Sequence, residues 1–139
     1  MSAASFSKVN HISIIQTKPV ESWTNTAAEK FIDLCEIKTP TCFFEGTARE
    51  AANIFPKSSN ITAMLALATI GMDNIKVKLI ADPINPIMNT SIHFDSAVGE
   101  LEINLKGVPS IENPSTSAEV PLSMIKTIRN ISSTISYGV

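Results

Sequence analysis

Residues 75–105 read IKVKLIADPINPIMNTSIHFDSAVGELEINL. Apolar and polar residues alternate in three parts of this stretch, 75–81, 92–94 and 101–105. A period of two places the apolar side chains on one face of a strand. Asp82-Pro83 ends the first strand, and Ala97-Val98-Gly99 joins the last two. We therefore predict three consecutive strands, with residues 84–88 as a loop, so that the sheet is at least partly antiparallel.

The residues before this stretch predict two further strands. Residues 9–15 alternate, and the strand stops near Lys18-Pro19 because proline donates no ladder hydrogen bond. Residues 41–44, TCFF, are short and strongly apolar, and Glu45-Gly46 is predicted to form a turn after them.

Four helices are predicted from capping residues and periodicity. Thr26 and Glu29 have the spacing of a capping box for a helix through Leu34. Thr47 is expected to cap a helix through Ile54. The other two helices span 58–70, which is apolar nearly all round and stops at Gly71, and 121–128, which follows a polar loop at 109–117.

The order of these elements indicates one α+β domain over residues 1–139. We expect a mixed, largely antiparallel open sheet with helices on one face. The other face is expected to be an apolar surface left open for a partner, and a homodimer through that face is the predicted assembly.

Composition narrows the class of protein. The 139 residues are 44% hydrophobic and 17% charged, with a net charge of -2, which is typical of a globular domain and argues against nucleic acid binding. Cys35 and Cys42, expected to be buried thiols, have no Cys/His partners for a zinc site. No apolar run is long enough for a membrane span, and the N-terminus lacks a signal-peptide pattern, so a cytoplasmic location is expected.

Several short motifs occur in a fixed order along the chain. They are FEGTAREA at 44–51, FPK at 55–57, Asn60, ADP at 81–83, VP at 108–109 and NPSTS at 113–117, with TKP at 17–19 before them. This series resembles the C-terminal domain of the L-aspartate dehydrogenase family. The resemblance implies a fold similar to the C-terminal domain of glyceraldehyde-3-phosphate-dehydrogenase-like proteins.

The resemblance also implies a function. Members of the family use NAD or NADP to convert L-aspartate reversibly to iminoaspartate, and then to oxaloacetate and ammonia, a reaction that feeds NAD biosynthesis. Their N-terminal Rossmann domain binds the dinucleotide, whereas the C-terminal domain is catalytic and forms the dimer. The five glycines of this chain form no GxGxxG motif. We therefore expect the chain to be inactive without a dinucleotide-binding domain.

The resemblance places the family's catalytic histidine at Thr90, or at Ser91 if the alignment is matched on Asn89. Neither side chain can act as a general acid or base near neutral pH. His93 lies nearby and has a suitable ordinary pKa, but on a strand it faces away from residue 90. His93 is thus either a displaced catalytic residue or a half-exposed strand histidine, and His11 is a weaker candidate.

Other site residues are predicted for cofactor and substrate. The resemblance places Asn60 against the cofactor, although asparagine there also suits a helix cap. Lys18, at the end of the first strand, is a candidate partner for a substrate carboxylate. So are Asn113, Thr116 and Ser117, which alternatively cap a helix; Ser115 stands where the family has lysine. Glu45 and Arg49 are predicted to form a structural ion pair.

Three functions remain open at this point. The chain is either the C-terminal domain of an L-aspartate dehydrogenase, a non-catalytic dimerisation module derived from that family, or part of a related dehydrogenase with another substrate. The retained motifs favour the first function, and the missing histidine favours the second.

Overall fold

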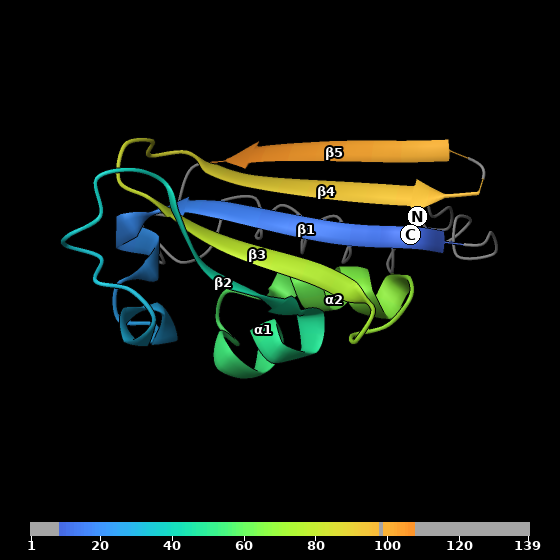
Figure 1. Ribbon diagram of the computed structural model, residues 1–139, viewed down its shortest axis with the longest axis horizontal. Coiled ribbons are helices and arrows are strands. Elements are labelled where there is room, and N and C mark those ends of the chain that lie inside the picture. The colour runs from blue at the N-terminus through green and yellow to red at the C-terminus, as the bar shows by residue number, and fades with distance from the viewer. Residues whose placement is uncertain (1–8, 98, 108–139) are drawn as a thin grey trace, which may run out of the picture.

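The structure, a computed structural model, describes residues 9–97 and 99–107. Five strands form one open sheet in the order β2-β3-β1-β4-β5 (Figure 1). The pair β1–β3 is parallel, and the other three pairs are antiparallel. The strands are β1 Val9–Pro19, β2 Thr41–Thr47, β3 Ile75–Asp82, β4 Met88–Ser96 and β5 Gly99–Gly107. The predicted mixed, largely antiparallel open sheet is confirmed.

Two α-helices, α1 (Ala48–Ile54) and α2 (Asn60–Ala68), lie on one face of the sheet. They belong to the long connection from β1 to β3, which a parallel pair requires. Ile12 and Ile14 of β1 pair with Ile75 and Val77 of β3, and all four side chains are fully buried. Leu65 and other small or apolar residues of the helices complete the core. We call this helix-covered side of the sheet the inner face.

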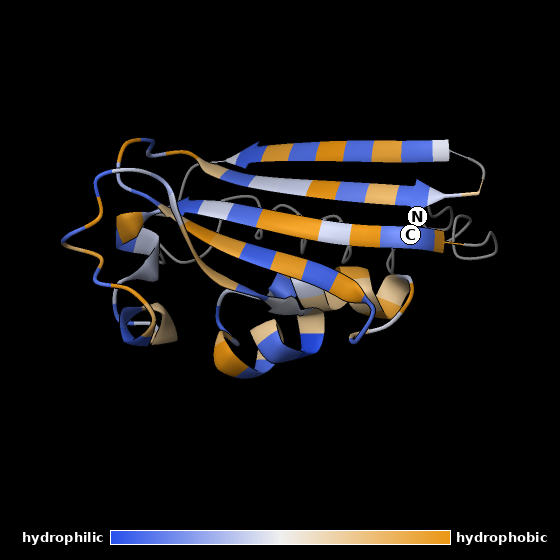
Figure 2. Cartoon of the chain, viewed as in Figure 1, coloured by the Kyte–Doolittle hydropathy of each residue, from blue (hydrophilic) through white to orange (hydrophobic). Residues whose placement is uncertain are grey.

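The opposite side, here called the outer face, is mostly polar. Lys76, Lys78 and His93 alternate with buried residues of β3 and β4, and Glu102 and Asn104 alternate with the aliphatic residues of β5, which are exposed or half-buried. Figure 2 shows the resulting bands of hydrophilic and hydrophobic residues along β3 and β5. The expectation of an apolar open face was therefore wrong, because β4 and β5 place their aliphatic side chains on the inner face and their polar ones outside.

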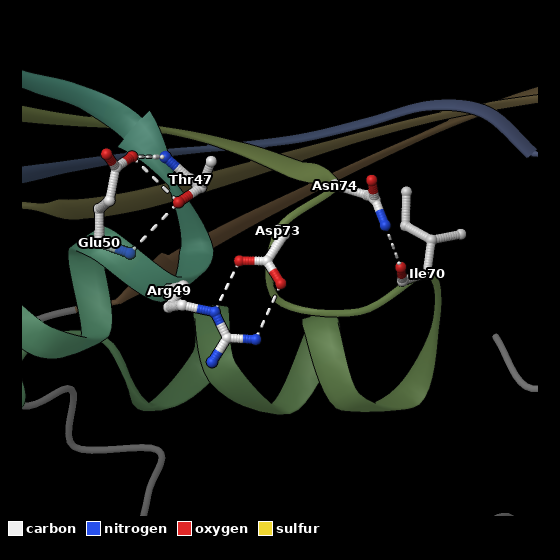
Figure 3. Close-up of polar contacts among 6 residues, drawn as sticks. All are labelled: Thr47, Arg49, Glu50, Ile70, Asp73 and Asn74. Atoms are coloured by element: carbon white, nitrogen blue, oxygen red, sulfur yellow. Dashed lines mark hydrogen bonds and ion pairs between the residues drawn. The ribbon is translucent and has the colours of Figure 1, made fainter.

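Helix α1 begins as its sequence predicts. The Thr47 hydroxyl accepts a hydrogen bond from the Glu50 backbone N–H, and the Glu50 carboxylate accepts one from the Thr47 N–H at 2.7 Å (Figure 3). Glu45-Gly46, predicted as a turn, instead belongs to β2. Gly46 fits there because a Cβ would lie 2.8 Å from the Phe44 ring. The strand can therefore continue directly into the cap of α1.

The predicted ion pair between Glu45 and Arg49 does not form. Arg49 makes two hydrogen bonds to Asp73, at 2.6 and 2.8 Å, and these tie α1 to the turn before β3 (Figure 3). Glu45 lies 3.3 Å from Lys78 instead, because its side chain faces outward from β2 toward the neighbouring strand.

The segment predicted as a helix through Leu34 is shorter than expected. It forms a single 3-10 turn, η3 (Ala27–Lys30), capped by Thr26. Glu29 does not complete a capping box with Thr26, since its carboxylate accepts from the N–H of Asn25, whose φ is +59°. Asp33 then accepts from the Cys35 N–H, a local turn that competes with further helix.

Both cysteines, Cys35 and Cys42, are free and exposed rather than buried, because one lies in this irregular segment and the other at the bulge of the edge strand β2. The helix predicted at 121–128 lies outside the described residues. No helix in the described part of the chain is long and apolar enough to cross a membrane.

Candidate active site

A group of buried polar side chains lies on the inner face, toward the carboxyl end of β1. Gln16 and Lys18 continue the register of the buried isoleucines, and they are only 2% and 7% exposed. Gln16 pairs with Thr90 of β4, which is also buried. From α2, the Thr62 hydroxyl donates to Gln16 Oε1 at 3.5 Å. We call these four residues the inner polar cluster.

Lys18 is held by the turn that follows β1. Pro19 ends the strand, and the 3-10 helix η2 (Val20–Trp23) returns the chain so that the Trp23 ring lies 4.9 Å from Lys18 Nζ. Trp23 is fixed in turn, because its indole N–H donates to the Ile80 carbonyl at 3.1 Å and its ring packs edge-on against Phe43. A cation over an indole face is attracted electrostatically.

Burial changes the acid-base behaviour of Lys18. Removing the ammonium group from water disfavours its charged form, and this lowers the pKa of Lys18 from 10.5 to about 8. Lysines with lowered pKa values are well suited to bind or exchange protons near neutral pH, and such groups gather at functional sites.

The beginning of α2 adjoins this cluster. Ser59, not Asn60, is the residue that precedes the helix, and the buried Ser59 hydroxyl donates to the Ala51 carbonyl at 3.0 Å rather than capping the helix. Asn60 is the first helical residue and is exposed, so the alternative that Asn60 caps α2 was wrong. Its exposed position, two residues before Thr62, leaves it accessible to a bound molecule.

The two candidate histidines lie on the outer face. His93 is opposite Ser13 on β1 and Glu102 on β5, and His11 is opposite Asp95. They face away from Thr90 and Lys18, as the strand alternation predicts. Of the two positions that the resemblance allows for the family histidine, Thr90 shares the inner face with Lys18, whereas Ser91 faces outward and donates to Asn104.

Three predicted substrate residues, Asn113, Thr116 and Ser117, lie outside the described residues. Sequence reasoning missed Gln16 and Thr62. Gln16 could have been found, because it continues the period-two register of Ile12 and Ile14 into buried positions. The described residues contain no group of three side chains that could hold a metal ion.

An open mixed sheet with two helices on one face defines an α+β domain. The sequence matches one protein-family model, "Aspartate dehydrogenase, C-terminal", over residues 1–131. The chain belongs to the aspartate dehydrogenase family, as its C-terminal domain.

Individual relatives agree. The chain is 40% identical over 124 residues to an L-aspartate dehydrogenase of Psychrobacter cryohalolentis, a match that covers 89% of this chain and 47% of the relative. It is 42% identical over 113 residues to one of Acinetobacter baylyi, covering 81% and 43%. The crystal structure of aspartate dehydrogenase from Thermotoga maritima matches with a TM-score of 0.70 at 26% identity, over 99% of this chain and 50% of that chain. The chain thus spans about half the length of these relatives.

Proposed function

We propose that this chain is the substrate-side domain of an NAD(P)-dependent L-aspartate dehydrogenase. Together with a dinucleotide-binding domain it would interconvert L-aspartate and iminoaspartate, which water converts to oxaloacetate and ammonia. The observation that carries the proposal is the inner polar cluster, a buried lysine with amide and hydroxyl groups, in a domain of this family. Buried polar groups that converge on one place are the usual means of orienting a small polar substrate.

In this proposal the chain contributes the substrate side of the active site, and the dinucleotide phosphates are assigned to the other domain. Asn60, exposed at the start of α2, has an amide that could pair with the carboxamide of a nicotinamide. That group, when bound, accepts or donates the hydride. The proposed role of this chain is to hold the substrate with Lys18 and with Asn113, Thr116 and Ser117.

The proposal is tested by adding the missing half. The full chain would be fused to the dinucleotide-binding half of the Psychrobacter relative, and oxidation of NADH or NADPH measured with oxaloacetate and ammonium. We expect turnover by the fusion, none by either half alone, and no change with Lys30→Met, which alters an exposed lysine. Absence of turnover in the fusion, both as it stands and with Thr90→His, refutes the proposal.

A non-catalytic assembly module is the second candidate, and Thr90 at the family's histidine position favours it. The same fusion separates the two functions. Turnover only after Thr90→His would mean that the fold retains the substrate site while the natural chain has lost catalysis.

We further propose that the chain forms a homodimer through the outer face, in the cytoplasm. Lys76 and Lys78 lie on β3, and Glu100 and Glu102 lie on β5, with β1 and β4 between these two strands. A two-fold axis parallel to the strands brings Lys76 and Lys78 of one sheet against Glu100 and Glu102 of its copy. Sedimentation should show a dimer that Lys76→Glu with Lys78→Glu dissociates and Lys30→Glu does not. A monomer at all protein concentrations contradicts this assembly.

A further inference from the structure

Oxidation of an amino acid to an imine needs a neutral amine. At neutral pH the α-amino group carries a proton, and its nitrogen lone pair is then not available to form the C=N bond. A base must remove that proton, and a base is most effective when its pKa lies near the working pH. The resemblance places the family's histidine at Thr90 or at Ser91; only Thr90 lies on the inner face, and its hydroxyl is not such a base.

The described residues offer one titratable group in the right place. Along the strands, the inner-face positions carry aliphatic, hydroxyl and amide side chains together with Lys18. Both histidines lie on the outer face. At this end of the sheet, Asp82 accepts hydrogen bonds from the N–H groups of residues 84 and 85, and Glu21 of η2 is exposed.

The register brings Lys18 within reach of the residue-90 position. Gln16 is directly opposite Thr90, and Lys18 is two residues farther along β1 on the same face. Lys18 and Thr90 are therefore diagonal cross-strand neighbours, for which Cβ atoms are roughly 7 Å apart, a gap that a lysine side chain spans. Trp23 on one side limits where the Nζ atom can lie.

We propose that Lys18 is the base that removes the proton from the substrate's α-ammonium group. The ammonium N–H bond breaks, its electron pair stays on the substrate nitrogen, and a new N–H bond forms on Lys18 Nζ, which later loses the proton to water. This inference rests on the proposed function and adds the proton carrier to it. It also changes the expected contact of Lys18 from a substrate carboxylate to the substrate nitrogen.

The lowered pKa of Lys18, about 8, supports this role, because a substantial fraction of the side chain is then the neutral amine in mildly alkaline solution.

Lys18→Arg separates a base from a carboxylate partner. Arginine keeps the positive charge but cannot give up its proton. In the fused protein we expect Lys18→Arg to lower kcat at least about a hundredfold while KM for L-aspartate changes little. Adding Thr90→His to Lys18→Arg should restore part of kcat. The pH at which kcat rises should then move toward the ordinary histidine pKa of about 6.5. Lys30→Met is the matched control.

A second measurement does not depend on turnover. In the fused protein near pH 9, side-chain NMR of Lys18 should show protonation when L-aspartate binds, and calorimetry in two buffers should show no proton taken from the buffer. A Lys18→Arg variant with unchanged kcat, or a Lys18 that stays neutral or draws its proton from the buffer, overturns the inference. Loss of activity in every variant, including Thr90→His, refutes the proposed function instead.

Discussion

Replacing Lys18 with methionine should stabilise the domain by an amount that depends on pH. Methionine fills a similar volume without a charge. Burial lowers the pKa of Lys18 from 10.5 to about 8, and each unit corresponds to about 1.4 kcal/mol, so the charged lysine costs the folded state about 3 kcal/mol near pH 7. Lys18→Met should therefore be the more stable protein near neutral pH.

The sign of the pH dependence follows from proton binding. Between pH 8 and 10.5 the unfolded chain holds a proton on Lys18 that the folded chain has lost, so the stability of the natural protein rises with pH in this window. Below pH 8 Lys18 is protonated in both the folded and the unfolded state, and the full free-energy cost of burying its charge is present. The advantage of Lys18→Met should thus shrink by about 2 kcal/mol between about pH 7 and pH 9.5.

Urea unfolding of both proteins at several pH values measures this difference. Lys30→Met, at an exposed position, should show no comparable trend. A free-energy difference between Lys18→Met and the natural protein that stays constant with pH would show that the Lys18 ammonium is not desolvated in the fold, and the argument about its pKa would fail.

Three further predictions concern packing. Gly46→Ala should lower the free energy of unfolding by about 1–3 kcal/mol, since the new methyl group would lie 2.7 Å from the Glu50 carboxylate and 2.8 Å from the Phe44 ring. The loss should shrink in a Phe44→Leu background, and an unchanged loss contradicts Phe44 as the cause. Thr47→Ala should cost about 1 kcal/mol and Thr47→Ser much less, as measured by thermal unfolding, because only alanine removes the cap of α1. Leu65→Ala should lower the free energy of unfolding by about 2–5 kcal/mol and Leu67→Ala should lower it little, because these side chains of α2 are 3% and 79% exposed. Equal losses of this free energy in urea unfolding would mean that α2 is rotated about its axis.

Much of the fold could be predicted because its signals are local. The alternation over 75–82 and the hairpin that follows are written in adjacent residues, and the Thr47 capping box needs only a spacing of three. The predicted sequence of strands and helices was therefore largely confirmed. The predicted turn at Gly46 was wrong. Glycine favours turns locally, but here Gly46 lies in β2 and packs closely against Phe44.

The site was less predictable because it is assembled from distant segments. Lys18 was singled out from its position before Pro19, but its burial depends on Trp23 folding back and on Thr62 arriving from α2. The strand order that places β1 between β3 and β4 is likewise a tertiary property. An apolar outer face was expected because the sequence does not reveal which side of β4 and β5 the helices cover.

The central position of β1 has a consequence for how the chain is made. Of the five strands in this sheet β1 is synthesised first, yet both of its neighbours, β3 and β4, come later in the sequence, after β2, α1 and α2. On the ribosome its isoleucines must therefore stay without partners while most of the sheet is translated, and long-range closure of this kind is slow. The pairing of β1 is complete only once β4, which ends at Ser96, has also been made.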